Sequence, residues 1–255
     1  MRTILLAHVK RVVIKIGSGV ISNDDGLDLD RIATICEDVH KLRQRGYEVI
    51  LVSSAAVAAG KADLGIIGKP KTIPLKQAAA AIGQSRLMRA YKDSLRQYDL
   101  KAGQILLTRD DLANRRRYLN ARSTLNTLLR LGAIPVINEN DTVATDEIRF
   151  GDNDRLAALV AHLVHADLLV LLSDVDGLYD GPPSLAGSSL ITDVRGEDDL
   201  ADVQVGGTGS RSSSSSSVFA LPKMPRALVS AHTNSSFSSL SHATRIFLPP
   251  TTVCT

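Results

Sequence analysis

The chain has 255 residues, 44% of them hydrophobic and 22% charged, which fits one large globular domain or one domain with an appendage. The net charge of +3 does not indicate a nucleic-acid-binding protein. No apolar run approaches the roughly 20 residues of a membrane span, and no export signal is present, so we expect a cytoplasmic protein without membrane contact.

Apolar runs and amphipathic segments alternate along residues 9–173. The runs predict strands at 9–17, 47–54, 102–108, 133–138 and 167–173, and the amphipathic segments predict helices at 28–46, 75–98, 115–131 and 154–166. Strands that are apolar throughout and separated by helices indicate an α/β fold, with a mostly parallel open sheet covered by helices on both faces.

The last part of the chain has a different composition. No acidic residue follows Asp202, and residues 212–217 are six consecutive serines with no hydrophobic period around them. We therefore expect a domain over residues 1–209 and a Ser-rich, aberrant or disordered tail over 210–255. No helix or strand is predicted in that tail.

In a parallel sheet the ligand crevice lies beyond the carboxyl ends of the strands. The segments that follow the predicted strands are KIGSG, SSAAVAAG, TRDD, NENDT and SDVDG, and four of the five are dense in small or polar residues. The sequence thus predicts a site built from strand ends.

Lys15 stands near the end of the first apolar strand, where an ammonium group is costly unless it reaches water or an anion. Gly17 follows and allows a close turn with exposed N–H groups, so phosphate binding is one interpretation and a lysine reaching solvent is the other. Ser22 stands where a dinucleotide fingerprint needs its third glycine. Gly68 lacks the preceding glycine of a P-loop.

The segment INENDTVATDEIRFGDND, residues 137–154, holds two polar clusters on either side of a predicted hairpin at about 143–150. One of its residues could simply cap the following helix. Two clusters exceed what a cap needs, and Asn and Asp together can bind an ammonium group, an amide or a hydrated cation. The clusters comprise Asn138, Asn140 and Asp141, then Asp152, Asn153 and Asp154.

Ser173 and Asp174 end the last predicted strand, where they suit a purine or ribose as well as an ordinary turn. The two cysteines give neither a disulfide framework nor a metal cluster, and the histidines lack zinc-like spacing. No protein-bound metal site is predicted. The arginine-rich stretch 109–122 also carries acids at helical spacing, which favours a solvated helix face or a subunit contact.

Together the segments VVIKIGSGVI, VILVSSAAVAAG, AAAAIGQSRLM, GQILLTRDD, YLNARSTLNTLL, INENDTVATDEIRFGDND and LLSDVDGLYD closely resemble the glutamate 5-kinases of the amino acid kinase superfamily. The resemblance covers about residues 9–208. Its most specific part is the spaced INEND and GDND pair, which favours this family over its acetylglutamate, aspartate, carbamate and UMP kinase relatives.

The resemblance implies a three-layer sandwich that uses ATP and magnesium to phosphorylate the γ-carboxylate of L-glutamate, the first step of proline biosynthesis. It also implies a homo-oligomer, with proline as a feedback inhibitor. On the family pattern Lys15 grips the transferred phosphoryl group and Asp154 orients that lysine. The implied glutamate ligands are Ser54, Asp141 and Asn153, with Asn138 and Asp152 nearby, and the implied nucleotide contacts are Lys15, Gly17, Ser173, Asp174, Gly207, Thr208 and Gly209.

This chain departs from the family pattern at two places. Ala55 stands where the family usually has glycine, and Ser214 falls where a second phosphoryl-binding lysine belongs. We therefore expect weak activity or none. The alternatives are an active kinase with a divergent end, an impaired glutamate- or nucleotide-binding subunit with a regulatory or assembly role, another small-molecule carboxylate kinase, or a tail that is not a natural reading frame.

Overall fold

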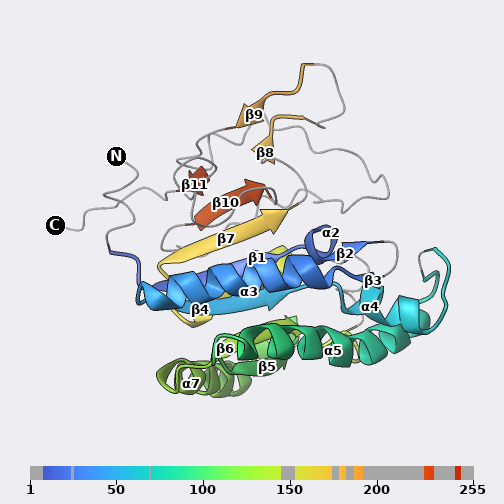
Figure 1. Ribbon diagram of the computed structural model, residues 1–255, viewed down its shortest axis with the longest axis horizontal. Coiled ribbons are helices and arrows are strands. Elements are labelled where there is room, and N and C mark those ends of the chain that lie inside the picture. The colour runs from blue at the N-terminus through green and yellow to red at the C-terminus, as the bar shows by residue number, and fades with distance from the viewer. Residues whose placement is uncertain are drawn as a thin grey trace.

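The computed structural model describes residues 8–23, 26–68, 70–144, 153–173, 178–181, 187–191, 227–232 and 245–247. A seven-stranded sheet in the order β11-β10-β7-β1-β4-β6-β5 forms its centre (Figure 1). The five predicted strands are all present, as β1 (Arg11–Ile16), β4 (Glu48–Ser53), β5 (Ala102–Leu107), β6 (Ile134–Glu139) and β7 (Leu168–Ser173). They pair in parallel, which confirms the mostly parallel sheet.

The four predicted helices are also present, as α3 (Leu29–Gln44), α5 (Ile73–Arg96), α7 (Arg115–Arg130) and α8 (Asn153–Leu163). Three shorter helices were not predicted: α2 (Ser18–Ile21), α4 (Ala56–Asp63) and α6 (Arg109–Ala113). Two antiparallel pairs of two-residue strands complete the described elements, β2 (Ser22–Asn23) with β3 (Gly26–Leu27) and β8 (Leu178–Tyr179) with β9 (Leu190–Ile191).

The expectation that no strand follows residue 209 is wrong. β10 (Ala227–His232) pairs in parallel with β7, and β11 (Arg245–Phe247) pairs antiparallel with β10. The N–H and C=O groups along a sheet edge accept any extended segment of suitable length, because the ladder is made by backbone and requires no particular side chains. A Ser-rich neighbourhood therefore does not prevent strand pairing.

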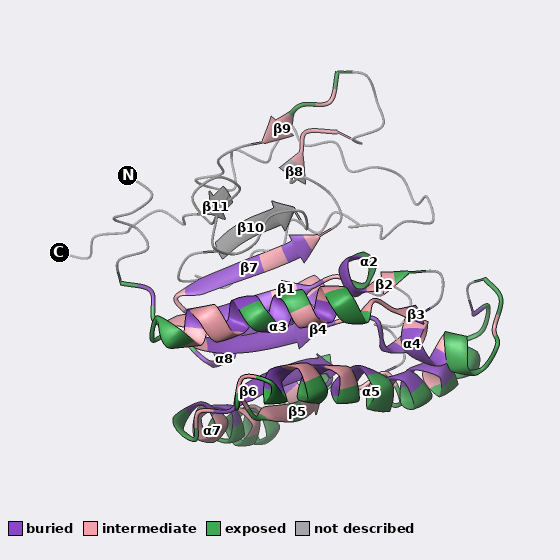
Figure 2. Ribbon diagram, viewed as in Figure 1, coloured by how far each residue is buried: buried purple, intermediate pink, exposed green. Residues whose placement is uncertain are grey.

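Strand side chains alternate between two cores, one on each face of the sheet. On β1, Ile14 and Ile16 belong to the core formed with α3 and α5, whereas Val13 belongs to the core formed with α7 and α8. Successive side chains of a strand point to opposite faces, so Lys15 lies on the α8 face. Buried and exposed positions accordingly alternate along α3 and α5 in Figure 2.

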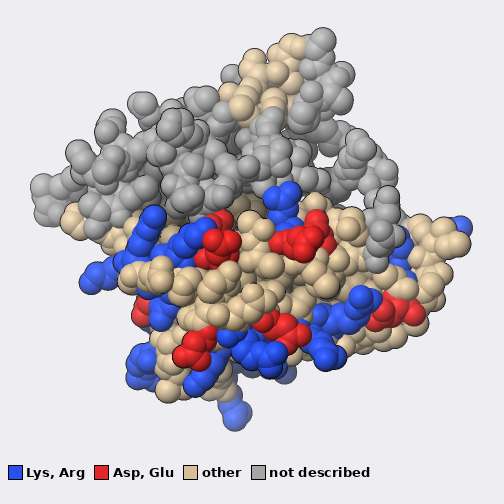
Figure 3. Space-filling view, viewed as in Figure 1, with Lys and Arg blue, Asp and Glu red and all other residues tan. Residues whose placement is uncertain are grey.

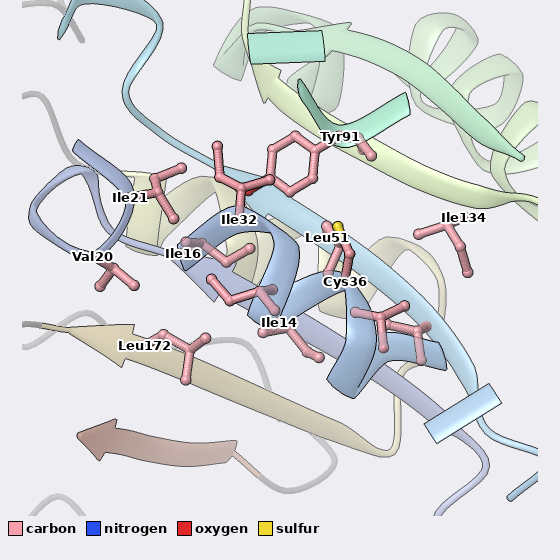
Figure 4. Close-up of a cluster of buried hydrophobic side chains, with 14 of the residues drawn as sticks. Ile14, Ile16, Val20, Ile21, Ile32, Cys36, Leu51, Tyr91, Ile134 and Leu172 are labelled. Carbon is pink, nitrogen blue, oxygen red and sulfur yellow. The ribbon is translucent and has the colours of Figure 1, made fainter. Parts of the chain in front are cut away.

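The core under α3 and α5 contains the one cysteine of the described chain. Figure 4 shows Cys36 in this cluster together with Tyr91 and Ile32. Burial raises the pKa of the Cys36 thiol to about 12, so the thiol stays protonated and unreactive. Cys36 is therefore a buried free thiol that acts as a packing residue.

The outer face over α3 and α5 is a solvated surface. Figure 3 shows basic and acidic side chains interspersed on this face. On α3, for example, Lys41 forms ion pairs with Glu37 and Asp38. Within the described ranges, no helix combines the length and the apolar character that a bilayer span requires.

Candidate active site

Lys15 and Asp154 form an ion pair where β1 ends and α8 begins. The Lys15 Nζ lies 2.5 Å from Asp154 Oδ1, and the lysine side chain is only 12% exposed. Strand alternation turns Lys15 toward α8, and Asp154 is the second residue of that helix. The pair therefore holds an ammonium group in a fixed position at the carboxyl end of the central strand. An ammonium group placed in this way can stabilise an anion.

Asn153, the first residue of α8, bridges to the ends of two other strands. Its Nδ2 atom lies 2.8 Å from the Ser53 carbonyl oxygen, 3.1 Å from Ser54 Oγ and 2.8 Å from Asn138 Oδ1. Asn153 is 7% exposed and Asn138 is 3% exposed, each value being for the whole residue. Because the Asn153 amide donates to strand ends, its role goes beyond capping a helix. The first turn of α8 thus joins β1, β4 and β6.

Two residues of α5 support this arrangement from the other face of the sheet. Gln84 Oε1 accepts a hydrogen bond from Asn138 Nδ2 over 2.7 Å, and the Tyr91 hydroxyl lies 2.9 Å from Ser53 Oγ. Burial raises the pKa of Tyr91, so it remains a neutral hydrogen-bonding group. Sequence reasoning assigned no role to Gln84 or Tyr91. A glutamine and a tyrosine in an amphipathic helix carry no signal of their own.

Asp141 follows the end of β6 by two residues and has a raised pKa. Burial raises the pKa of its carboxyl to about 6, because the ionised form loses hydration there. It lies in a turn in which the Val143 and Ala144 N–H groups donate to the Asn140 carbonyl. A partly desolvated carboxylate of this kind favours a cationic partner, such as the ammonium group of an amino acid.

The sequence predicts an exposed N–H group at Gly17, beside Lys15. In the structure this N–H group is hydrogen-bonded instead. It donates to the Leu172 carbonyl oxygen over 3.1 Å, and the residue has an ordinary φ of −67°. A Cβ atom at this position would lie 3.2 Å from that oxygen and 3.8 Å from Lys15 Nζ. Glycine therefore leaves room next to the lysine without offering a free donor.

The structure brings five of the predicted site residues together, namely Lys15, Ser54, Asn138, Asn153 and Asp154. Ser173 ends β7, the neighbour of β1 in the sheet. Asp152, Asp174, Gly207, Thr208 and Gly209 lie outside the described residues, as do most of the predicted hairpin and Ser214. The TRDD segment forms a capping box between Thr108 and Asp111 at the start of α6, so its polar side chains serve the helix.

The described side chains of the site include the Lys15 ammonium group, the Asn138 and Asn153 amides and the Asp154 carboxylate. Among the described residues, no group of three or more His, Cys, Asp or Glu side chains could hold a metal ion. Magnesium that accompanies a nucleotide is bound largely by phosphate oxygens and water, with one or two carboxylates. The Lys15–Asp154 pair fits that arrangement.

Residues 10–234 match the model of the amino acid kinase family. The chain is 67% identical over 183 residues to a glutamate 5-kinase of Syntrophotalea carbinolica and 63% identical over 184 residues to one of Geobacter metallireducens. Each match covers 72% of this chain and 49% of the relative. A glutamate 5-kinase of Streptomyces coelicolor is 52% identical over 205 residues, 80% of this chain and 55% of the relative. The chain thus spans about half the length of these curated relatives.

Proposed function

The chain belongs to the amino acid kinase family, and we propose that it binds L-glutamate and ATP and transfers the γ-phosphoryl group of ATP to the glutamate γ-carboxylate. The observation that carries this proposal is the first turn of α8. There Asn153 contacts Ser54 and Asn138, while the adjacent Asp154 contacts Lys15. A polar amide cluster and a cationic phosphate anchor are thereby held side by side.

The proposed reaction moves a phosphoryl group and no proton. A γ-carboxylate oxygen of glutamate forms a bond to the γ-phosphorus, the bond between that phosphorus and the β,γ-bridging oxygen breaks, and ADP leaves. The nucleophile is already an anion, so no general base is needed and positioning dominates. Lys15 offsets the charge of the transferred group, and Asp154 keeps its ammonium in place.

The two ends of glutamate require different partners. Asp141 would accept the α-ammonium group, and that contact would lower the raised pKa of its carboxyl. Ser54, Asn153 and the neighbouring Asn138 would supply neutral hydrogen bonds, with Asp152 close by in sequence.

The nucleotide half of the site would include Lys15, Gly17, Ser173 and Asp174. Gly207, Thr208 and Gly209, from the glycine-rich segment 206–209, would complete it. Magnesium, when bound with ATP, would neutralise part of the phosphate charge. Membership of a biosynthetic kinase family supports a cytoplasmic protein that assembles as a homo-oligomer and responds to proline as a feedback inhibitor.

The test is a hydroxamate assay on the full chain with ATP, magnesium, L-glutamate and hydroxylamine, because hydroxylamine traps an acyl phosphate. We expect weak but measurable γ-glutamyl hydroxamate, because Ser214 replaces a second cationic ligand. Lys15→Ala lowers the rate at least about 100-fold, whereas Lys92→Ala, an exposed lysine on α5, leaves it unchanged.

Two other outcomes have distinct meanings. Glutamate binding without hydroxamate would favour an impaired binding subunit with a regulatory role. A rate that is insensitive to Lys15→Ala would refute the assignment of this lysine, and a chain that neither binds glutamate nor forms hydroxamate would refute the proposed function.

A further inference from the structure

We propose that Gln84 is a positioning residue that holds the Asn138 amide in its hydrogen-bonded orientation and, through it, holds Asn153 in place. This inference rests on the proposed function, because it concerns the glutamate half of the same site. Gln84 reaches Asn138 from α5, across 54 positions of sequence, with Oε1 2.7 Å from Nδ2. The three side-chain amides form one chain of hydrogen bonds, Gln84 to Asn138 to Asn153.

Two backbone groups fix the direction of this hydrogen-bond chain. The Ser53 carbonyl can only accept, so the side chain of Asn153 must face it with Nδ2. The Glu139 N–H can only donate, and its nitrogen lies 2.9 Å from Asn138 Oδ1. Asn138 must therefore direct Oδ1, and not Nδ2, toward this N–H group. Asn138 Nδ2 then faces Gln84, which must offer Oε1.

The position of Gln84 is fixed because α5 packs closely against α4 at the preceding residue, Gly83. A Cβ atom on the preceding residue, Gly83, would lie 1.9 Å from the Ala56 carbonyl oxygen and 2.3 Å from the Gly60 nitrogen. The backbones of α4 and α5 are therefore in contact at this point. That contact fixes the distance between the α5 backbone and the strand end that carries Asn138.

The consequence for the site is a defined polarity at Asn153. Its nitrogen is used by Ser53, Ser54 and Asn138, and its Oδ1 makes no hydrogen bond to a described residue. As an acceptor, Oδ1 suits an N–H donor such as an ammonium group better than a carboxylate. Without the Gln84 acceptor, Asn138 Nδ2 would lose its partner, and the hydrogen bonds that Asn138 makes to Glu139 and Asn153 would be held less firmly.

The test compares Gln84→Met, which keeps the length and removes the acceptor, with Gln84→Glu, which keeps an acceptor. Gln104→Met, the same change at an exposed residue of β5, is the matched control. Two quantities are measured on the full chain: the affinity for L-glutamate by calorimetry, and the solvent exchange of the Asn138 and Asn153 side-chain amide protons by NMR.

We expect Gln84→Met to weaken glutamate binding roughly tenfold and to speed amide exchange by a similar factor. Gln84→Glu restores slow exchange, and Gln104→Met changes neither quantity. If Gln84 acts through Asn138, Gln84→Met has no further effect on affinity in an Asn138→Ala background. A role that is merely structural would lower affinity to the same extent in both backgrounds.

The two proposals fail in different ways. Wild-type chain that binds glutamate no better than Gln84→Met refutes the positioning role and leaves the proposed function intact. If the wild-type chain does not bind glutamate, the proposed function is refuted. The positioning role is then tested by amide exchange alone, and equal exchange rates in the wild type and Gln84→Met would refute it.

Discussion

At the scale of single residues, Ala55 has the least favourable backbone conformation near the site. Its φ of 79° and ψ of 7° place it in the left-handed region, directly after Ser54 and before the first residue of α4. For an L-residue with a Cβ atom this conformation costs about 1–2 kcal/mol. A glycine, which the family resemblance implies at this position, would avoid that cost, so Ala55 corresponds to real strain in the fold.

Ala55→Gly is therefore expected to raise the free energy of unfolding by up to about 1 kcal/mol, since the relief of strain outweighs the loss of one buried methyl group. Ala58→Gly, the same change in the regular interior of α4, should lower it by about 1 kcal/mol. Urea unfolding of the two variants and the wild type measures both changes in the free energy of unfolding. Equal effects at the two positions would show that Ala55 is unstrained.

The raised pKa of Asp141 predicts a pH-dependent stability. The folded state holds the Asp141 proton up to about pH 6, whereas the ordinary pKa of the carboxyl, which applies in the unfolded chain, is 3.8. Ionisation is thus penalised in the folded state. The penalty is absent at pH values below the unfolded pKa, grows as pH rises from about 4 to about 6, and is complete above that range.

Asp141→Asn should accordingly stabilise the chain by about 1–3 kcal/mol at pH 7.5. The advantage over wild type should shrink steadily at lower pH and disappear near pH 4. Urea unfolding across that pH range tests this, with Asp93→Asn on the exposed face of α5 as a control. A gain in stability that does not change with pH would rule out a desolvated Asp141.

The residues that carry unusual chemistry were predictable from the sequence, and those that support them were not. A lysine in an apolar strand and two amide–acid clusters beside strand and helix ends are conspicuous, so Lys15, Asn138 and Asn153 could be singled out. Gln84 and Tyr91 are ordinary residues of an amphipathic helix. Their roles depend on which strand that helix covers, and this is a property of the tertiary fold.

At the scale of elements, α4 and α5 pack through two glycines. A Cβ atom on Gly60 would lie 1.8 Å from the Ala79 carbonyl oxygen, and one on Gly83 would lie 1.9 Å from the Ala56 carbonyl oxygen. The helix backbones are close enough that neither position leaves room for a methyl group. This contact positions both the turn after β4 and the α5 residues that face Asn138.

Gly83→Ala should therefore lower the free energy of unfolding by about 1–3 kcal/mol, because the helices must separate to admit the new methyl group. It should also weaken glutamate binding by displacing Gln84. Ser85→Ala, an exposed position two residues along, should change stability by less than about 0.5 kcal/mol. Unfolding midpoints in urea decide the matter, and equal stability of both variants would contradict the close helix contact.

The sequence predicted the long elements and failed on the short or locally unpatterned ones. Buried parallel strands are continuous apolar runs, and α3 to α8 include four helices long enough to show a helical period. α4 consists mostly of small residues, so its period is weak. β10 and β11 join the sheet by backbone pairing at its edge, and no side-chain pattern predicts such pairing.

At the scale of the whole molecule, the winding of the chain determines where the site forms. β1 lies between β4 and β7 in the sheet, so the chain leaves β1 toward one edge and returns on its other side. Such a switch point leaves a crevice beyond the strand ends. The first turn of α8 contacts the ends of β1, β4 and β6 at this point.

The central claim is that these strand ends form one L-glutamate site within a chain about half as long as its curated relatives. Calorimetric titration of L-glutamate into the full chain tests it most directly. We expect one binding event per chain, weakened at least tenfold in Asn153→Ala and unchanged in Asn120→Ala, an exposed asparagine of α7. Absence of binding in the wild type, or equal affinity in Asn153→Ala, would contradict the account.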